Sequence, residues 1–226
     1  MKVAHVAFIA VCFVGVSSLA GCSGAGGGGA IAPVTGAKNQ SVSHYTSPTA
    51  TPTPIQLVIG TTVGTPVFPE GDTATGGQGQ QIQGINCRKE LLNTYHHHVH
   101  LSLFVNGEQI ALPRGTGMKN PGTSQFVYHA TCFYFLHTHD ATGIIHVEPP
   151  TNNVFTLKQY FAIWGEPLST NGFATYSGPV AVYINGTLQP GMDPNTIALT
   201  PYEEITLVIG TPPSWIPAYL FPAGYP

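Results

Sequence analysis

The segment Tyr95-His96-His97-His98-Val99-His100-Leu101-Ser102-Leu103-Phe104-Val105-Asn106-Gly107 predicts how this chain folds and where its chemistry lies. Every second residue from Val99 to Val105 is apolar, which is the pattern of a β-strand with one buried face. The Asn-Gly pair that follows favours the positive φ angles of a two-residue turn, so a second strand should return beside the first. The segment therefore predicts a β-hairpin whose other face carries histidines.

Histidines elsewhere in the chain repeat the spacing seen in this strand. Eight of the ten histidines lie between positions 96 and 146. Three pairs of possible ligands lie two positions apart, at i and i+2, namely His98 with His100, His137 with His139, and His146 with Glu148. In a strand, residues i and i+2 point to the same face, so three adjacent strands could direct six ligand atoms at one place. Because neutral imidazole binds transition metals, the five histidines of these pairs are the predicted metal ligands.

A second turn sets the register between two of the histidine-bearing segments. Asp140-Ala141-Thr142-Gly143 has aspartate at its first position and glycine at its last, as β-turns prefer. If the flanking strands pair tightly across this turn, His137 lies opposite His146. The same register puts Phe135 opposite Glu148. Cross-strand neighbours have Cβ atoms about 5 Å apart, which suits two imidazoles on one metal ion, and a slip of one residue would remove the pairing.

The composition and the turn signals indicate an all-β fold, an antiparallel sandwich or barrel, for residues 55–226. The chain has 27 glycines and 20 prolines, and its apolar runs are short, as in domains built from strands and turns. One short helix is predicted at about 156–164. Thr156 can cap this helix, its apolar residues have helical spacing, and Gly165 can end it.

Three further segments predict elements elsewhere in the domain. The hexapeptides Ile55–Gly60 and Ile205–Gly210 are nearly identical, and each predicts a strand. Asn185-Gly186 is a second Asn-Gly pair and predicts another hairpin. The C-terminal aromatic residues around Trp215 and Tyr219 are expected to cover the sheet edge, with docking of a partner as the alternative.

The N-terminus has the features of an export signal. A long apolar run, Val3–Val16, follows Lys2 and leads into Leu19-Ala20-Gly21-Cys22. This tetrapeptide resembles the lipobox of bacterial lipoproteins, which implies cleavage before Cys22 and attachment of lipid to the new N-terminal cysteine. Ser23 at the next position then implies sorting to the outer membrane, on its periplasmic or surface side, if the cell is Gram-negative. An ordinary secretory signal cleaved at about the same place is the alternative.

These signals divide the chain into three parts. Residues 1–21 are the expected signal peptide, 22–54 a lipidated flexible tether, and 55–226 a single histidine-rich β-domain. The tether is rich in Gly and Ala at 24–30 and in Pro and Thr at 47–54, and such a composition cannot bury a core. The tether would therefore hold the domain at the membrane surface.

The cysteines predict one disulfide. Cys12 would leave with the signal and Cys22 would carry lipid, so Cys87 and Cys132 remain as an even pair in an exported chain. Closing a loop of about 45 residues could stabilise the fold by roughly 3 to 4 kcal/mol. The alternative is that both thiolates bind metal, which an oxidising compartment disfavours.

The charge of the chain excludes one broad class of function. There are seven Lys and Arg residues and a formal net charge of −3, so no basic face is available for nucleic acid. The sequence also lacks a Gly-rich phosphate loop after a strand and a Gly-x-Ser-x-Gly elbow. Nucleotide-binding and serine-hydrolase functions are therefore disfavoured.

Three functions are compatible with the histidine pattern. The first is a cell-envelope lipoprotein that binds a zinc or copper ion without catalysis. The second is a metal-dependent hydratase or hydrolase in which Glu148 or Asp140 orients the attacking water. A His-x-His pair with a third histidine from a neighbouring strand resembles the carbonic anhydrase zinc site, which gives the second hypothesis its reaction class. The third is a structural β-domain whose histidines are incidental.

Two criteria discriminate among these functions. A closed site with four protein ligands favours capture, whereas three ligands with an open position favour catalysis. Copper(I) carriers favour Met and Cys, and this chain has three methionines and two cysteines expected to be oxidised. The histidine clusters also resemble those of exported bacterial proteins of unknown activity, and this resemblance implies no reaction.

Overall fold

A mixed seven-stranded β-sheet forms the centre of the computed structural model, which describes residues 53–90 and 94–225. The strands of this sheet are β2 (His97–Val105), β3 (Glu108–Ile110), β6 (Leu136–His137), β7 (Ile144–Val147), β11 (Val180–Ile184), β12 (Thr187–Leu188) and β13 (Glu204–Ile209). Their order is β12-β11-β13-β2-β7-β6, with β3 paired to β2. The histidine-bearing strands β2, β7 and β6 are thus neighbours, as the spacing predicts.

The other elements are short and lie outside this sheet. They are β1 (Ile55–Gln56), β4 (Met118–Lys119), β5 (Cys132–Phe133), β8 (Leu168–Ser169), β9 (Gly172–Phe173), β10 (Tyr176–Ser177), β14 (Tyr219–Leu220), the α-helix α1 (Leu157–Trp164), and the 3-10 helices Gly71–Ala74 and Pro194–Thr196. Strands β1 and β14 pair with each other, as do β4 and β5, and β8, β9 and β10 form a third small sheet.

The all-β prediction is confirmed, with two refinements. Strands β2 and β13 run parallel, and so do β1 and β14, so the arrangement is sandwich-like and mixed rather than purely antiparallel. Within residues 53–90 and 94–225 the central sheet does not close into a barrel. Strands β2 and β13 are not joined by a hairpin, which would require antiparallel pairing, so the chain is free to bring them together in the parallel direction.

Both Asn-Gly pairs form the predicted hairpins. Asn106 and Gly107 have φ angles of 50° and 86° between β2 and β3. Asn185 and Gly186 have φ angles of 49° and 75° between β11 and β12. These positive values are the ones that the residue pair tolerates at low cost.

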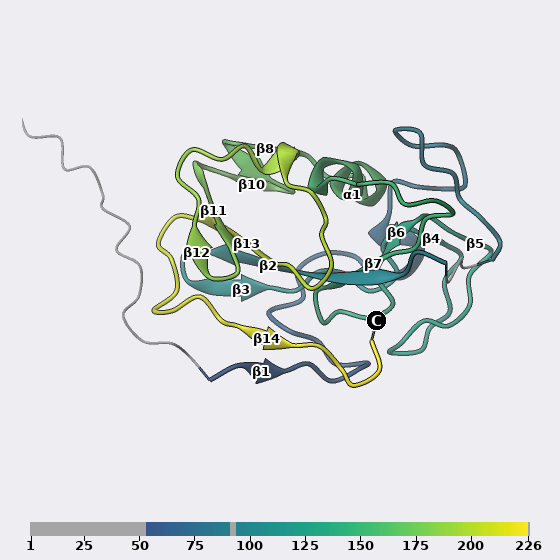
Figure 1. The fold of residues 1–226 in the computed structure, drawn as a ribbon, viewed down its shortest axis with the longest axis horizontal. Helices are drawn as coiled ribbons and strands as arrows, with labels where there is room; N and C mark the ends of the chain where they lie inside the picture. The colour runs from purple at the N-terminus through teal and green to yellow at the C-terminus, as the bar shows by residue number, and fades with distance from the viewer. Residues whose placement is uncertain (1–52, 91–93, 226) are drawn as a thin grey trace, which may run out of the picture. The chain divides into compact units, whose positions relative to one another are not determined.

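The helix α1 has the predicted bounds and packs on one face of the central sheet. The Thr156 N–H donates to Gln159 Oε1 at 2.9 Å, and Gly165 ends the helix with a φ of 85°. The apolar side of the helix and the odd-numbered residues of β2 belong to one buried cluster, which includes Val99, Leu101, Leu103, Leu157, Tyr160, Phe161 and Trp164. Figure 1 shows α1, β8 and β10 on the same side of the sheet.

The opposite face of the sheet carries the histidines and lies beneath the C-terminal segment. Ile216 belongs to one small buried cluster with Phe104 of β2, and Tyr219 belongs to another with Ile144 of β7. In Figure 1, β14 and β1 lie on this side, away from α1. The C-terminal segment therefore covers a face of the sheet rather than its edge, although Trp215 remains 51% exposed.

The two nearly identical hexapeptides differ in structure. Glu204–Ile209 is a strand inside the central sheet, whereas only Ile55–Gln56 of the first hexapeptide is a strand. Val58 and Ile59 are exposed, and the Gly60 N–H donates to Asp140 Oδ2 rather than to a neighbouring strand. The prediction of a full strand over Ile55–Gly60 is wrong because tertiary neighbours, not local sequence, supply the hydrogen bonds of a strand.

The expected signal peptide, Cys22 and nearly all of the expected tether lie outside the described residues. Among residues 53–90 and 94–225, the structure has no helix of the length and apolarity needed to cross a membrane. The lipidation of Cys22 thus stays a prediction.

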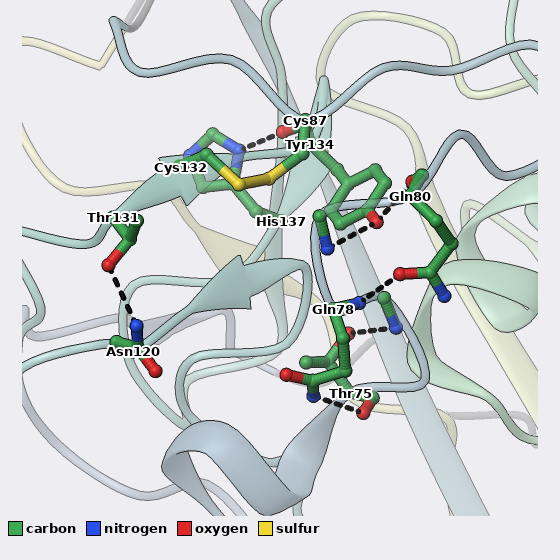
Figure 2. Close-up of a disulfide and its surroundings, with 11 residues drawn as sticks. Thr75, Gln78, Gln80, Cys87, Asn120, Thr131, Cys132, Tyr134 and His137 are labelled. Carbon is green, nitrogen blue, oxygen red and sulfur yellow. Dashed lines mark hydrogen bonds between the residues drawn. A yellow bond between two sulfur atoms is a disulfide. The ribbon is translucent and has the colours of Figure 1, made fainter.

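The predicted Cys87–Cys132 disulfide is confirmed, and it lies near His137. The two Cα atoms are 5.4 Å apart, and 45 positions separate the cysteines in the sequence. Beside the bridge, the Arg88 and Phe133 backbones exchange hydrogen bonds of 2.8 and 2.7 Å. Figure 2 shows the disulfide close to His137. The bridge is compatible with an exported protein.

A close approach at Gly117 provides a test of how the 113–122 segment packs against β6, the strand that carries His137. A Cβ atom on Gly117 would lie 2.3 Å from Leu136 O, and the residue has a φ of +73°. At Gly186 the φ is +75° and nothing lies within 4 Å of the added atom. We expect Gly186→Ala to lower the free energy of unfolding by about 1 kcal/mol through backbone strain alone. Gly117→Ala should cost at least about 2 kcal/mol, because the clash is added to the strain.

Urea unfolding of both variants and of the wild type measures this difference. Equal losses of unfolding free energy in Gly117→Ala and Gly186→Ala would show that the segment around Gly117 is not tightly packed against the strand that carries His137.

Candidate metal centre

The register of three strands brings histidines from distant parts of the sequence into one row. His98 of β2 pairs with His146 of β7, and His146 pairs with His137 of β6 on its other side. The Glu148 N–H donates to Phe135 O at 2.8 Å, which continues the same register. Both pairings predicted across the 140–143 turn are therefore confirmed.

The first group of possible ligands, here called the inner group, consists of His137, His139, His146 and Glu148. One ligand atom of each side chain lies within 4.8 Å of those of the others, and all four residues are buried. His137 Nε2 is 3.1 Å from His139 Nε2, and Glu148 Oε1 is 3.8 Å from His137 Nε2 and 3.4 Å from His146 Nδ1. This set of three imidazoles and one carboxylate is of a kind that holds zinc.

Backbone carbonyls fix the tautomers of two inner histidines. His137 Nδ1 lies 2.8 Å from Tyr134 O, a contact drawn in Figure 2, and His139 Nδ1 lies in contact with Val127 O. A carbonyl oxygen only accepts, so each Nδ1 must carry the proton, and each neutral ring then has a lone pair on Nε2. These two lone pairs face each other across 3.1 Å. Such contacts from the second ring nitrogen are the usual way in which proteins orient metal-binding imidazoles.

The second group, here called the outer group, consists of His96, His98 and His146. His96 Nε2 is 3.0 Å from His98 Nε2 and 3.3 Å from His146 Nδ1, and the latter two atoms are 3.2 Å apart. Two ligands of a tetrahedral zinc ion, with bonds of about 2.0–2.1 Å, lie about 3.3 Å apart. The three nitrogens thus already have the separations of one face of a tetrahedron.

His96 was not among the predicted ligands. It precedes β2 and shares the parity of His98, and the register that places His98 opposite His146 also places His96 opposite Glu148. His96 Nε2 lies 3.1 Å from Glu148 Oε1, and the His96 side chain is 21% exposed. The strand register, rather than the spacing within the segment, was the signal that could have identified His96.

The structure does not bring His100 into either group. A step of two residues along a strand is about 6.7 Å, so His100 lies opposite Ile144 instead of His146. His100 Nε2 hydrogen-bonds to Thr142 O at 2.9 Å, and its ring packs on Tyr219 with centroids 4.1 Å apart. His96 and His98 have the same two-residue spacing, and their Nε2 atoms lie 3.0 Å apart. The contacts of His100 with Thr142 O and Tyr219, and not the step along the strand, therefore keep its ring out of the outer group.

Asp140 also lies outside both groups and instead fixes the turn between β6 and β7. Its Oδ1 accepts from the Thr142 N–H at 3.1 Å and from the Thr142 hydroxyl, and its Oδ2 accepts from the Gly60 N–H at 2.8 Å. Both carboxylate oxygens are therefore occupied by structural hydrogen bonds. Of the two carboxylates predicted to orient a water, only Glu148 lies among the histidines.

Aromatic rings surround the cluster. Tyr225 packs on His98 with ring centroids 4.3 Å apart, and Phe126 stacks on His139 at 4.6 Å with an interplanar angle of 1°. Phe133 lies 5.6 Å from His137. These rings limit the contact of the imidazoles with water and hold the ring planes in place.

Burial dominates the electrostatics of the cluster. The pKa values of His137 and His146 lie well below the usual value for histidine. The largest cause is burial away from water, and the second is the charge of the nearby His139. Burial also lowers the pKa of His96 and of His139. Burial raises the pKa of the Glu148 carboxyl to about 7. The lowered pKa values favour the neutral imidazoles of His96, His137, His139 and His146 near pH 7, and the neutral form is the one that binds metals.

Comparisons with known proteins found no matching family model, no matching curated protein and no matching solved structure. The functional argument therefore rests on the geometry of the cluster.

Proposed function

We propose that this protein binds a transition-metal ion, zinc or copper, through its buried histidine cluster and holds it at the cell envelope. One observation carries the proposal, namely the 3.1 Å separation of the Nε2 atoms of His137 and His139. Both rings have their proton on Nδ1, so two lone pairs would repel each other unless a cation lies between them or one ring gains a second proton. A bound metal ion turns this repulsion into coordination.

The choice between zinc and copper follows from the donor atoms. Imidazole nitrogens and a carboxylate suit Zn²⁺ and Cu²⁺, whereas Cu⁺ prefers thiolates and thioethers. Cys87 and Cys132 are joined in a disulfide and offer no thiolate. The divalent ions therefore fit the cluster better than Cu⁺.

Capture fits the inner group better than catalysis. Three imidazoles and Glu148 already supply four protein ligands, and all four residues are buried. A tetrahedral ion bound there has no open position for the water that a hydratase or hydrolase must activate. The support for a non-catalytic function is thus the number of ligands and their burial.

The place in the cell is proposed from the sequence. The Leu19-Ala20-Gly21-Cys22 tetrapeptide would attach the domain to a membrane through lipid on Cys22. The disulfide supports export, because such bonds persist in oxidising compartments. Mass spectrometry of the N-terminal peptide from membrane fractions tests this part: a diacylated or triacylated Cys22 is expected, and an unmodified peptide beginning elsewhere contradicts it.

Calorimetric titration of the purified full-length chain with Zn²⁺ and Cu²⁺ tests the binding itself. We expect at least one equivalent to bind and His137→Ala to weaken binding more than about 10-fold, because it removes a ligand. His129→Ala is the matched control, since His129 is exposed and outside both groups, and it should bind as the wild type does. Bound metal should also raise the thermal unfolding temperature. Binding of less than one equivalent by the wild type would remove the proposal.

A further inference from the structure

The two groups of ligands overlap without merging into one. His146 belongs to both, while His137 and His139 are particular to the inner group and His96 and His98 to the outer group. Ligands on opposite sides of one zinc ion lie at most about 4.2 Å apart, because each bond is about 2.1 Å. The whole set does not form a single group even at 4.8 Å. One ion therefore cannot use every ligand in these positions.

The contacts within the outer group favour a bound cation for a separate reason. Each ring nitrogen of a neutral imidazole is either a donor or an acceptor. Three such atoms lie 3.0–3.3 Å from one another in His96, His98 and His146. Each of the three nitrogens is either a donor or an acceptor, so at least two of them must be of the same kind. At least one of the three contacts therefore joins two donors or two acceptors. Hydrogen bonds alone thus cannot account for all three contacts of the outer group, just as they cannot account for the contact between His137 Nε2 and His139 Nε2.

Two side chains lie where they can serve both groups. Glu148 Oε1 is 3.1 Å from His96 Nε2 in the outer group and 3.8 Å from His137 Nε2 in the inner group. Glu148 Oε2 is buried and has no hydrogen-bond partner among the described residues. A carboxylate has two oxygens, so Glu148 can bind two ions. A neutral imidazole has a lone pair on only one nitrogen, so His146 can bind two ions once its N–H proton is released to solvent and both nitrogens carry a lone pair.

We propose that the cluster is a two-ion centre, with an inner ion on His137 and His139 and an outer ion on His96 and His98. His146 and Glu148 lie between the two positions and are shared by them. This inference rests on the proposed metal-binding function and adds a second ion of the same chemical class, Zn²⁺ or Cu²⁺. The partly exposed His96 makes the outer position the one nearer to solvent.

Metal stoichiometry of the purified full-length chain tests the proposal. Saturation with Zn²⁺ should give two equivalents for the wild type, one for His98→Ala and one for His139→Ala. His96→Ala is a second outer variant, chosen because its partly exposed side chain leaves a smaller cavity, and it should also retain one equivalent. His97→Ala is the matched control. His97 lies between two outer ligands in the sequence, but its Nε2 contacts Leu199 O instead, so two equivalents should remain.

Copper(II) loading gives an independent readout. Two Cu²⁺ ions that share His146 should be coupled by their spins, and the EPR spectrum of the wild type should differ from the single-ion spectra of His98→Ala and His139→Ala. One equivalent in the wild type, with an ordinary single-ion spectrum, would overturn the two-ion centre and leave the proposed function standing. No bound metal in the wild type would instead overturn both.

Discussion

The His146→Ala variant is expected to lose metal binding at both groups, with the dissociation constant for zinc raised more than about 100-fold. Loss of a residue that only hydrogen-bonds to a metal ligand already lowers metal affinity 10- to 100-fold. Loss of a ligand that both groups share should lower the affinity more. His146 Nδ1 lies 3.2 Å from His98 Nε2 and 3.4 Å from Glu148 Oε1, so it is central to the cluster. Competition with a chelator of known zinc affinity measures the change.

His100→Ala is the matched control for this variant. His100 is also a buried histidine on the same face of the sheet, but it hydrogen-bonds to Thr142 O and belongs to neither group. We expect His100→Ala to lower the free energy of unfolding through the cavity that it leaves, while zinc affinity changes less than about threefold. Equal losses of affinity in the two variants would mean that general disruption of this face, and not loss of a ligand, explains the result.

Removal of the Cys87–Cys132 disulfide is expected to lower the free energy of unfolding by about 4 kcal/mol. The closed loop spans 45 positions, and the chain-entropy model gives about this value for a loop of that length. Urea unfolding of the Cys87→Ser, Cys132→Ser double variant against the oxidised wild type measures the loss.

Reduction of the wild type is the control for the double variant. A reductant should lower the stability of the wild type by a similar amount and should leave the double variant unchanged. A loss below about 1 kcal/mol would show that the segments beside the bridge are held by other contacts, such as the backbone hydrogen bonds between Arg88 and Phe133.

Local signals were sufficient for several elements. The two Asn-Gly pairs form hairpins, and α1 ends at Gly165 as expected, because these features depend on the φ preferences of a few adjacent residues. The pairing of His137 with His146 was predictable because a short turn joins their strands, and a tight turn fixes the register. The disulfide followed from the count of cysteines that would remain after removal of the expected export signal and lipidation of Cys22.

Non-local pairing explains what was missed. His96 and His100 flank His98 with the same two-residue spacing, yet only His96 reaches the cluster. The choice depends on which residue of β7 lies opposite His98, and no local pattern in β2 contains that information. The hexapeptides at 55–60 and 205–210 differ for the same reason, since only the second has strands on both sides.

The sequence by itself determined the β-rich class of this protein, its hairpins, its disulfide and a set of histidines that could hold a metal ion, because each depends on residue type and short-range spacing. Only the tertiary structure decided which histidines meet, that Glu148 joins them while Asp140 holds a turn, and that the ligands form two overlapping groups. The physical reason is that coordination requires ligand atoms within a few ångströms of one another. That distance is set by the register between strands that lie up to 50 residues apart in the chain, as His96 and His146 do.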